Sequence, residues 1–233
     1  MKFLTKFVDY NDPKSFGSRI REKRSYIIKD MICDVFEKKG SVNIIDIGGR
    51  KTYWNTIGEE FLTEKKCKIT LLNLENIDCP NDSEIFKFQY GDACQIPFSD
   101  KFFHIAHSNS VIEHVGNMED MLKFSKETQR IAKSYYVQTP NFWFPFEPHF
   151  MFPFFHWLPK PLRIKMIQNF NLGHIEKSNN LIDAIIKIES ANLLTSKEIK
   201  NLFTDGKQIR EKVFGITKSI TAIRKEDENC NCS

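Results

Sequence analysis

The sequence lacks the features that mark a membrane-spanning, secreted or zinc-binding protein. No apolar run reaches about 18 residues, the length that begins to span a bilayer, and the apolar stretch near the N-terminus is too short for a secretory signal. The six cysteines form no C-x-x-C pair and have no matching His-x-x-x-His, which argues against zinc and against a disulfide framework. We therefore expect a reduced, cytoplasmic protein without a metal site.

A strong excess of charge is also lacking. The 34 basic and 30 acidic residues leave a net charge of +4, too mild to indicate a nucleic-acid-binding protein. The densest basic run, from Arg19 to Arg24, has two interpretations: a solvated helix face or a local contact with an anion.

The 233 residues suit a single α/β domain over 1–233, with 41% hydrophobic residues to build its core. Apolar runs at 42–47, 68–74, 85–90, 102–108 and 134–138 predict strands, and helical spacing predicts helices at 15–39, 54–64, 118–132 and 196–203. Gly215 between runs at 208–214 and 216–223 predicts a tight hairpin. This alternation predicts a doubly wound, mostly parallel seven-stranded sheet that is closed by an antiparallel hairpin.

The strand–helix rhythm breaks between residues 141 and 193. Residues 141–162 contain nine Phe or Trp residues and five prolines, which predicts neither a regular helix nor a central strand. We expect an insertion that folds over the strand ends as a lid and shapes an apolar acceptor pocket. Two alternatives remain open: a hydrophobic cap on the sheet edge, and peripheral membrane contact through 141–163.

The stretch from Val42 to Trp54 is the centre of the predicted site. A buried strand ends there in Asp46, Gly48 and Gly49, and in open α/β sheets ligands bind beyond such strand ends. An acid at this turn favours a nucleoside over a pyrophosphate. G-x-G-x-x-G and Walker loops are absent, and bulky Arg50 would obstruct a pyrophosphate, which argues against a nucleotide-linked oxidoreductase.

Polar groups also follow the next two predicted strands. Asn73 and Glu75 follow the second strand, and G-D-A-C-Q-I-P-F, from Gly91 to Phe98, follows the third. Ten residues after that segment comes S-N-S-V-I-E-H-V, from Ser108 to Val115. Together with I-I-D-I-G, these segments resemble the class I S-adenosylmethionine-dependent methyltransferases, particularly their small "type 11" branch, over about residues 42–139.

The resemblance implies a site for S-adenosylmethionine. Its cofactor-binding residues would be Asp46, Gly48, Gly49, Asn73, Leu74, Glu75, Asp92, Ala93 and Asn109. The chain departs from the family at Arg50 and Thr52, which replace the second and third glycines of the usual loop. Simpler roles are also open: a capping acid for Asp46, a loop charge for Glu75 and an Asx-turn for Asp92.

The activity implied is methyl transfer to a small-molecule or lipid-linked acceptor. For an acceptor that carries a proton, His149 is the first candidate base, followed by Glu147 and His114. Glu147 and His149 lie between prolines in the aromatic insertion, which would hold them in place. The alternative is a catalytically silent methyltransferase-like module that binds a protein or membrane through this insertion. The sequence gives no indication of oligomeric state.

Overall fold

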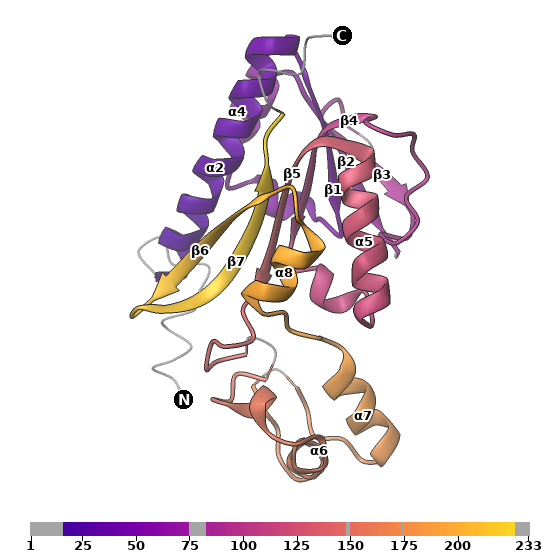
Figure 1. The fold of residues 1–233 in the computed structure, drawn as a ribbon, viewed down its shortest axis with the longest axis vertical. Helices are drawn as coiled ribbons and strands as arrows, with labels where there is room; N and C mark the ends of the chain where they lie inside the picture. The colour runs from indigo at the N-terminus through magenta and orange to yellow at the C-terminus, as the bar shows by residue number, and fades with distance from the viewer. Residues whose placement is uncertain (1–15, 75–82, 148–149, 174, 227–233) are drawn as a thin grey trace.

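A computed structural model describes residues 16–74, 83–147, 150–173 and 175–226. It shows one mixed seven-stranded sheet with the order β3-β2-β1-β4-β5-β7-β6 (Figure 1). The first five strands are parallel, and β7 is antiparallel to both β5 and β6. The strands are β1 (Val42–Ile47), β2 (Cys67–Asn73), β3 (Phe86–Tyr90), β4 (Phe103–Asn109), β5 (Ala132–Pro140), β6 (Lys207–Val213) and β7 (Ile216–Arg224).

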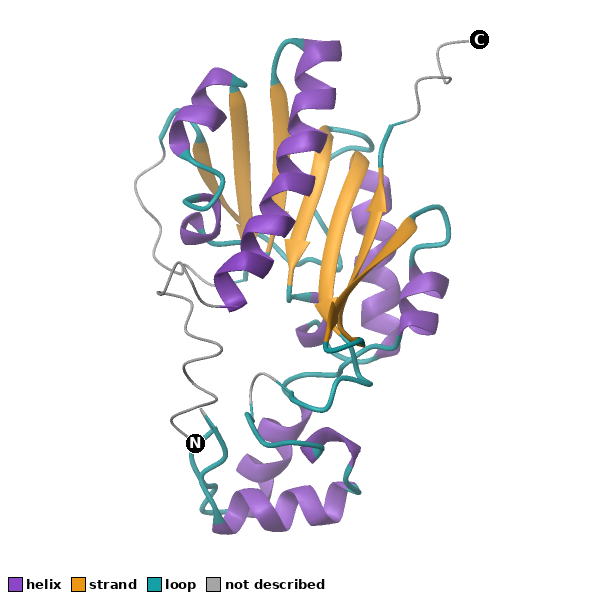
Figure 2. Cartoon of the chain, turned by 90° about the vertical axis from the view of Figure 1, so that its left-hand side faces the viewer, coloured by secondary structure: helices purple, strands orange, loops and turns teal. Residues whose placement is uncertain are grey.

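Helices cover both faces of the sheet (Figures 1 and 2). One face carries α2 (Phe16–Lys39), α3 (Lys51–Trp54) and α4 (Glu59–Glu64), and the other carries α5 (Met118–Ile131) and α8 (Ser196–Leu202). Each layer has its own apolar core. The predicted α/β class and doubly wound sheet are confirmed. No described helix is long and apolar enough to cross a bilayer.

Alternation along the strands explains why both faces are buried. Ile44 packs into the core beneath α2, whereas its neighbour Ile45 packs into the core beneath α5. Tyr135 and Tyr136 divide in the same way on β5. Because successive side chains of a strand point to opposite faces, a continuous apolar run is buried on both sides, as parallel sheets require.

The strand order reverses between β1 and β4. From β1 the chain proceeds outward through β2 to β3, and it then returns to place β4 on the other side of β1. The chain therefore leaves the carboxyl ends of these two neighbouring strands in opposite directions along the sheet. Ligands of doubly wound sheets bind at such a point.

The prediction of one continuous helix over 54–64 is wrong. The chain forms the short helix α3, turns through Thr56 to Gly58, and begins α4 at Glu59. Gly58 has a φ of +95°, and this conformation, which side chains other than glycine's rarely adopt, interrupts the helix. The remaining predicted strands and helices begin and end within two residues of the observed ones, with the largest difference at β5, which extends to Ala132 and Pro140.

The insertion at 141–193 forms a small helical unit beyond the carboxyl ends of the strands (Figures 1 and 2). It contains the 3₁₀ turn η2 (Phe155–Trp157), α6 (Lys160–Asn169) and α7 (Leu181–Glu189). The sequence did not predict these two helices, and Pro161 lies in the first turn of α6, where proline is tolerated. The unit has a core of its own, built from Phe150, Phe155, Ile167, Leu172, Ala184 and Ile188.

Hydrogen bonds fasten the insertion to the sheet at its base. Asn141 and Leu194 form a parallel bridge where the chain leaves and re-enters the main domain. The amide of Asn192 donates to the carbonyl of Glu113 at 2.7 Å. The turn between β6 and β7 has positive φ at Phe214 and Gly215, as a two-residue hairpin requires, so the predicted tight hairpin is confirmed.

Candidate functional site

A two-glycine turn follows β1. Gly48 has a φ of +68°, and a Cβ there would lie 2.6 Å from the side chain of Val111. Gly49 leaves even less room, because a Cβ would lie 1.8 Å from Oδ2 of Asp46. The amide of Gly48 donates to the carbonyl of Leu72, which ties the turn to β2. Only glycine fits either position, so the turn is held against β1, β2 and the loop after β4.

The carboxylate of Asp46 is buried and fully engaged. Its Oδ1 lies 2.6 Å from Nδ1 of His107, and its Oδ2 accepts a hydrogen bond of 2.7 Å from Nε1 of Trp54. An ionised carboxylate can only accept, so with Asp46 ionised Nδ1 of His107 is the donor; in the neutral form of the imidazole this leaves Nε2 as an acceptor. Asp46 therefore fixes both the orientation and the tautomer of the histidine.

The imidazole of His107 lies between two aromatic rings. The ring of Tyr136 is stacked on it at 5.4 Å between centroids, and the ring of Tyr53 lies 4.6 Å away on α3. His107 is 1% exposed, and its Nε2 has no hydrogen-bond partner among the described residues. A buried polar atom without a partner costs free energy, so it marks a position where a ligand or water is expected to bind.

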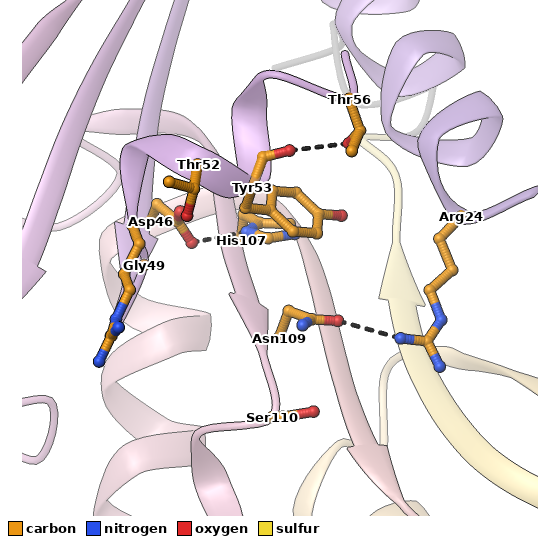
Figure 3. Close-up of a pocket in the computed structure, with 11 residues that line it drawn as sticks. Arg24, Asp46, Gly49, Thr52, Tyr53, Thr56, His107, Asn109 and Ser110 are labelled. Atoms are coloured by element: carbon orange, nitrogen blue, oxygen red, sulfur yellow. Dashed lines mark hydrogen bonds and ion pairs between the residues drawn. The ribbon is translucent and has the colours of Figure 1, made fainter. Parts of the chain in front are cut away.

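A cavity of about 390 Å³ opens at this point, between the start of α3 and the ends of β1 and β4 (Figure 3). It lies at the reversal of strand order. Its lining residues are Arg24, Asp46, Gly48, Gly49, Arg50, Thr52, Tyr53, Thr56, His107, Asn109 and Ser110. None of them belongs to 141–193, so the described part of the insertion does not line this cavity.

Arg24 of α2 closes the cavity on the side of the hairpin (Figure 3). Its guanidinium makes a two-pronged contact with Glu211 on β6, at 2.9 and 3.1 Å, and donates to Oγ of Ser219. A longer contact of 3.4 Å reaches Oδ1 of Asn109. Burial opposes the charge on Arg24, but Glu211 more than offsets it and raises the pKa of the guanidinium. A fixed cation therefore borders the cavity.

The loop after β4 carries local backbone strain beside the cavity. Ser110 has a φ of +57°, in the left-handed region. Its amide donates to the carbonyl of Gln138, and its Oγ donates to Oε1 of the same residue at 3.1 Å. Both bonds to β5 hold a conformation that a serine rarely adopts, and such strain is typical of ligand sites.

The predicted cofactor residues divide into three groups. The cavity brings together Asp46, Gly48, Gly49 and Asn109. The others that are described lie outside its lining: Asn73 donates to the carbonyl of Gly49, Asp92 accepts from the amide of Cys94, Leu74 is exposed, and Ala93 packs against the core. Glu75 lies outside the described residues. Their contacts with a cofactor stay predictions.

Neither of the two predicted bases that the structure describes, Glu147 and His114, lines the cavity. Glu147 is 2% exposed and accepts from the amide of Phe150 at 2.8 Å, within the insertion. Nδ1 of His114 lies 2.6 Å from the carbonyl of Ser190 and joins the turn after β4 to the insertion. His149 lies outside the described residues. Each catalytic role stays a prediction.

Several cavity residues were not predicted from the sequence, namely Arg24, Thr52, Tyr53, Thr56, His107 and Ser110. Of the two interpretations of the basic run, Arg24 shows the local contact with an anion, because it pairs with the carboxylate of Glu211. His107 had one available signal: it lies two residues before the predicted Asn109 on the same strand and therefore on the same face.

Comparison with known families identifies the central part of the chain. Residues 61–135, from α4 to the start of β5, match the family described as "Methyltransferase domain". Two uncharacterized proteins of Mycobacterium tuberculosis, MT1557 of strain CDC 1551 / Oshkosh and Rv1509 of strain H37Rv, are each 29% identical over 102 residues. This match covers 44% of the chain and 33% of the relatives, so the chain spans about a third of their length.

Two solved structures share the fold at low sequence identity. A CurJ carbon methyltransferase superimposes with a TM-score of 0.53 at 11% identity, over 96% of this chain and 58% of that one. A geranyl diphosphate methyltransferase in complex with SAM superimposes with a TM-score of 0.51 at 11% identity, over 93% of each chain.

Proposed function

We propose that this chain, which carries a class I methyltransferase domain, binds S-adenosylmethionine in the cavity between β1 and β4 and transfers its methyl group. The single observation that carries the proposal is His107: a buried, oriented imidazole lines this cavity, and its acceptor Nε2 has no partner among the described residues. The family match places the neighbouring strands β2 to β4 in a methyltransferase domain.

The residues present suit the amino-acid end of this cofactor. That end carries an ammonium and a carboxylate, and the cavity offers an acceptor at Nε2 of His107 and cations at Arg24 and Arg50. The two glycines give the turn beside them its shape, since a Cβ at either position would clash with Val111 or Asp46. These groups suit the two opposite charges of a zwitterion.

The nucleoside end would lie toward β2 and β3. Because Nδ2 of Asn73 donates to Gly49, its Oδ1 can accept from a ribose hydroxyl. Asp92 is exposed at the start of the loop after β3, and its Oδ1 forms an Asx-turn with the amide of Cys94. The turn and a ligand contact are compatible, because the second carboxylate oxygen can still accept a hydrogen bond.

When bound, S-adenosylmethionine supplies an electrophilic methyl group, and the chain has to orient the nucleophile, exclude water and accept any proton released. The rings of Tyr53 and Tyr136 pack against His107 and restrict its movement. His149 remains the proposed base for an acceptor that carries a proton, because the insertion it belongs to lies beyond the strand ends.

The acceptor we propose is a small molecule or a lipid-linked molecule. In the test, the protein and methyl-labelled S-adenosylmethionine are incubated in two parallel reactions. One contains the soluble-metabolite fraction of the source cells, and the other contains their lipid fraction. Label that moves into one fraction, together with S-adenosylhomocysteine, is the expected result. Cofactor binding without transfer to either fraction would contradict the acceptor class.

The alternative is a catalytically silent module, and one observation favours it. Both oxygens of Asp46 are already engaged by His107 and Trp54, so this acid can be a purely structural anchor of the glycine turn. Such a module would keep the fold and need not bind the cofactor. Titration with S-adenosylmethionine separates the two functions, since the silent module shows no saturable binding.

A further inference from the structure

Three aromatic side chains gather on the surface of the insertion. Trp143, Phe154 and Trp157 are 60%, 50% and 40% exposed, although large aromatic side chains are normally buried. The ring centroids of Trp143 and Trp157 lie 6.1 Å apart, and those of Phe154 and Trp157 lie 5.1 Å apart. We call these three residues the aromatic tip.

The loop that presents the aromatic tip is held firmly. Nε1 of Trp157 donates to the carbonyl of Phe142 at 2.9 Å, and the amide of Phe154 donates to the carbonyl of Pro145 at 2.7 Å. Phe154 has a φ of +61°, which turns its exposed side chain away from the buried Phe155 that follows. Preorganisation of this kind lowers the entropy lost when the rings meet a partner.

The segment that carries the aromatic tip also carries basic residues. Among the described residues from 141 to 173 the cations are Lys160, Arg163 and Lys165, and the one carboxylate, Glu147, is buried. Lys160 is paired with Glu189 of α7, whereas Lys165 is exposed on α6. The segment of residues 141–173 therefore carries both exposed aromatic rings and an exposed lysine.

The insertion also lies at a position that is accessible to the flat surface of a bilayer. It forms one end of the long axis of the molecule, beyond the carboxyl ends of the strands (Figure 1). Aromatic rings enter the headgroup region of a bilayer, and lysine or arginine beside them pairs with anionic lipid.

We propose that the aromatic tip, together with Lys165, docks the protein onto the surface of an anionic phospholipid bilayer. The docking is independent of methyl transfer. Only its consequence, that the acceptor is presented at the membrane and is lipid-linked, rests on the proposed function.

The test uses sedimentation of the full chain with vesicles of phosphatidylcholine alone and of phosphatidylcholine with phosphatidylglycerol. We expect binding to the anionic vesicles, weakened by salt. The double variant Trp143→Ser/Phe154→Ser should lower the vesicle affinity at least about tenfold through lost apolar burial. Lys165→Glu should lower it as well. Phe102→Ser is the matched control. It removes an exposed aromatic ring next to the amino end of β4, whereas the insertion lies beyond the carboxyl ends of the parallel strands.

Fluorescence adds a second readout. Of the three tryptophans, Trp54 is buried, so only Trp143 and Trp157 should be quenched by brominated lipid. Circular dichroism checks that each variant folds. The proposal is overturned if the wild type binds neither vesicle, if the double variant binds as the wild type does, or if the tip instead joins two copies of the chain or a protein. Vesicle binding without S-adenosylmethionine binding would refute the proposed function alone, and the reverse result would refute the docking alone.

Discussion

Nδ1 of His107 lies 2.6 Å from Oδ1 of Asp46, and both side chains are 1% exposed. The two residues are 61 positions apart in the chain, and they meet because β1 and β4 are neighbours in the sheet at the point where strand order reverses. Trp54 binds the other carboxylate oxygen, so one acid joins two strands and the helix after the glycine turn.

Asp46→Asn should destabilise the protein. The amide can still accept from one of its two present donors, but its NH₂ group then faces the other. Loss of one buried hydrogen bond with an unpaired donor costs about 1 to 3 kcal/mol, which urea denaturation would measure as a lower free energy of unfolding. Asp100→Asn is the control, since Asp100 is an exposed partner of Arg130 and should change stability by less than about 0.5 kcal/mol. Equal effects of the two substitutions would contradict the anchoring role.

Gly49→Ala should abolish ligand binding as well as reduce stability. The added Cβ would lie 1.8 Å from Oδ2 of Asp46 and force the carboxylate away from its partners. Gly40→Ala is the matched control: its φ is +73°, but a Cβ there meets nothing within 4 Å. The control should lose about 1 to 2 kcal/mol from the left-handed conformation alone and keep its affinity for S-adenosylmethionine. Equilibrium dialysis of both variants measures this difference, and an unchanged affinity in Gly49→Ala would place the ligand elsewhere.

Arg24→Met should selectively weaken the binding of S-adenosylmethionine. If Arg24 meets the carboxylate of the ligand, its removal should cost about ten- to a hundredfold in affinity. Binding of 5′-methylthioadenosine, which lacks that carboxylate, should stay the same. Arg210→Met provides the control, because Arg210 lies on β6 and contacts Ser196 outside the cavity. A parallel loss for both ligands would show that Arg24 acts only through its packing against Glu211.

The loop at 92–98 should loosen in acid. Glu127 of α5 accepts from the amide of Ile96 at 2.7 Å and pairs with Arg130, which also donates to the carbonyls of Ile96 and Phe98. The hydrogen bond from Arg130 is the main cause of the lowered pKa of Glu127, against the effect of burial. Since the folded pKa lies below the ordinary 4.5, the carboxylate stabilises the native loop above that pH, and the contribution is lost as the pH falls through the lowered pKa.

An NMR titration of the Ile96 amide would follow this loss. In Glu127→Gln the acid step should disappear, because the side chain no longer titrates. Glu119→Gln on the same helix should leave the step in place. A step that persists in Glu127→Gln would assign the loop's acid sensitivity to another group.

The sheet could be predicted because its signals are local. A strand buried on both faces is a continuous apolar run, and Asp46, Gly48 and Gly49 mark its end. The hairpin at Phe214 and Gly215 also has a local signal, the single glycine between two strands. These features depend on residues a few positions apart.

Much of the site could not be predicted, because its contacts join distant parts of the chain. Arg24 contacts Glu211 across 187 positions, and nothing in the basic run around Arg24 indicates which acid it meets. The helix expected over 54–64 failed for a different reason: apolar spacing continued through Gly58, whose positive φ ends the helix regardless of pattern. The helices of the insertion were hidden by the prolines and aromatic residues that precede them.

Calorimetric titration of the wild-type protein with S-adenosylmethionine tests the central claim most directly. The account predicts saturable binding at one site with micromolar or tighter affinity, because the cavity offers Arg24, Arg50 and the unpartnered Nε2 of His107 to the amino-acid end of the ligand. The absence of binding heat at several temperatures, in protein whose circular dichroism shows an intact fold, would contradict it and favour the silent binding module.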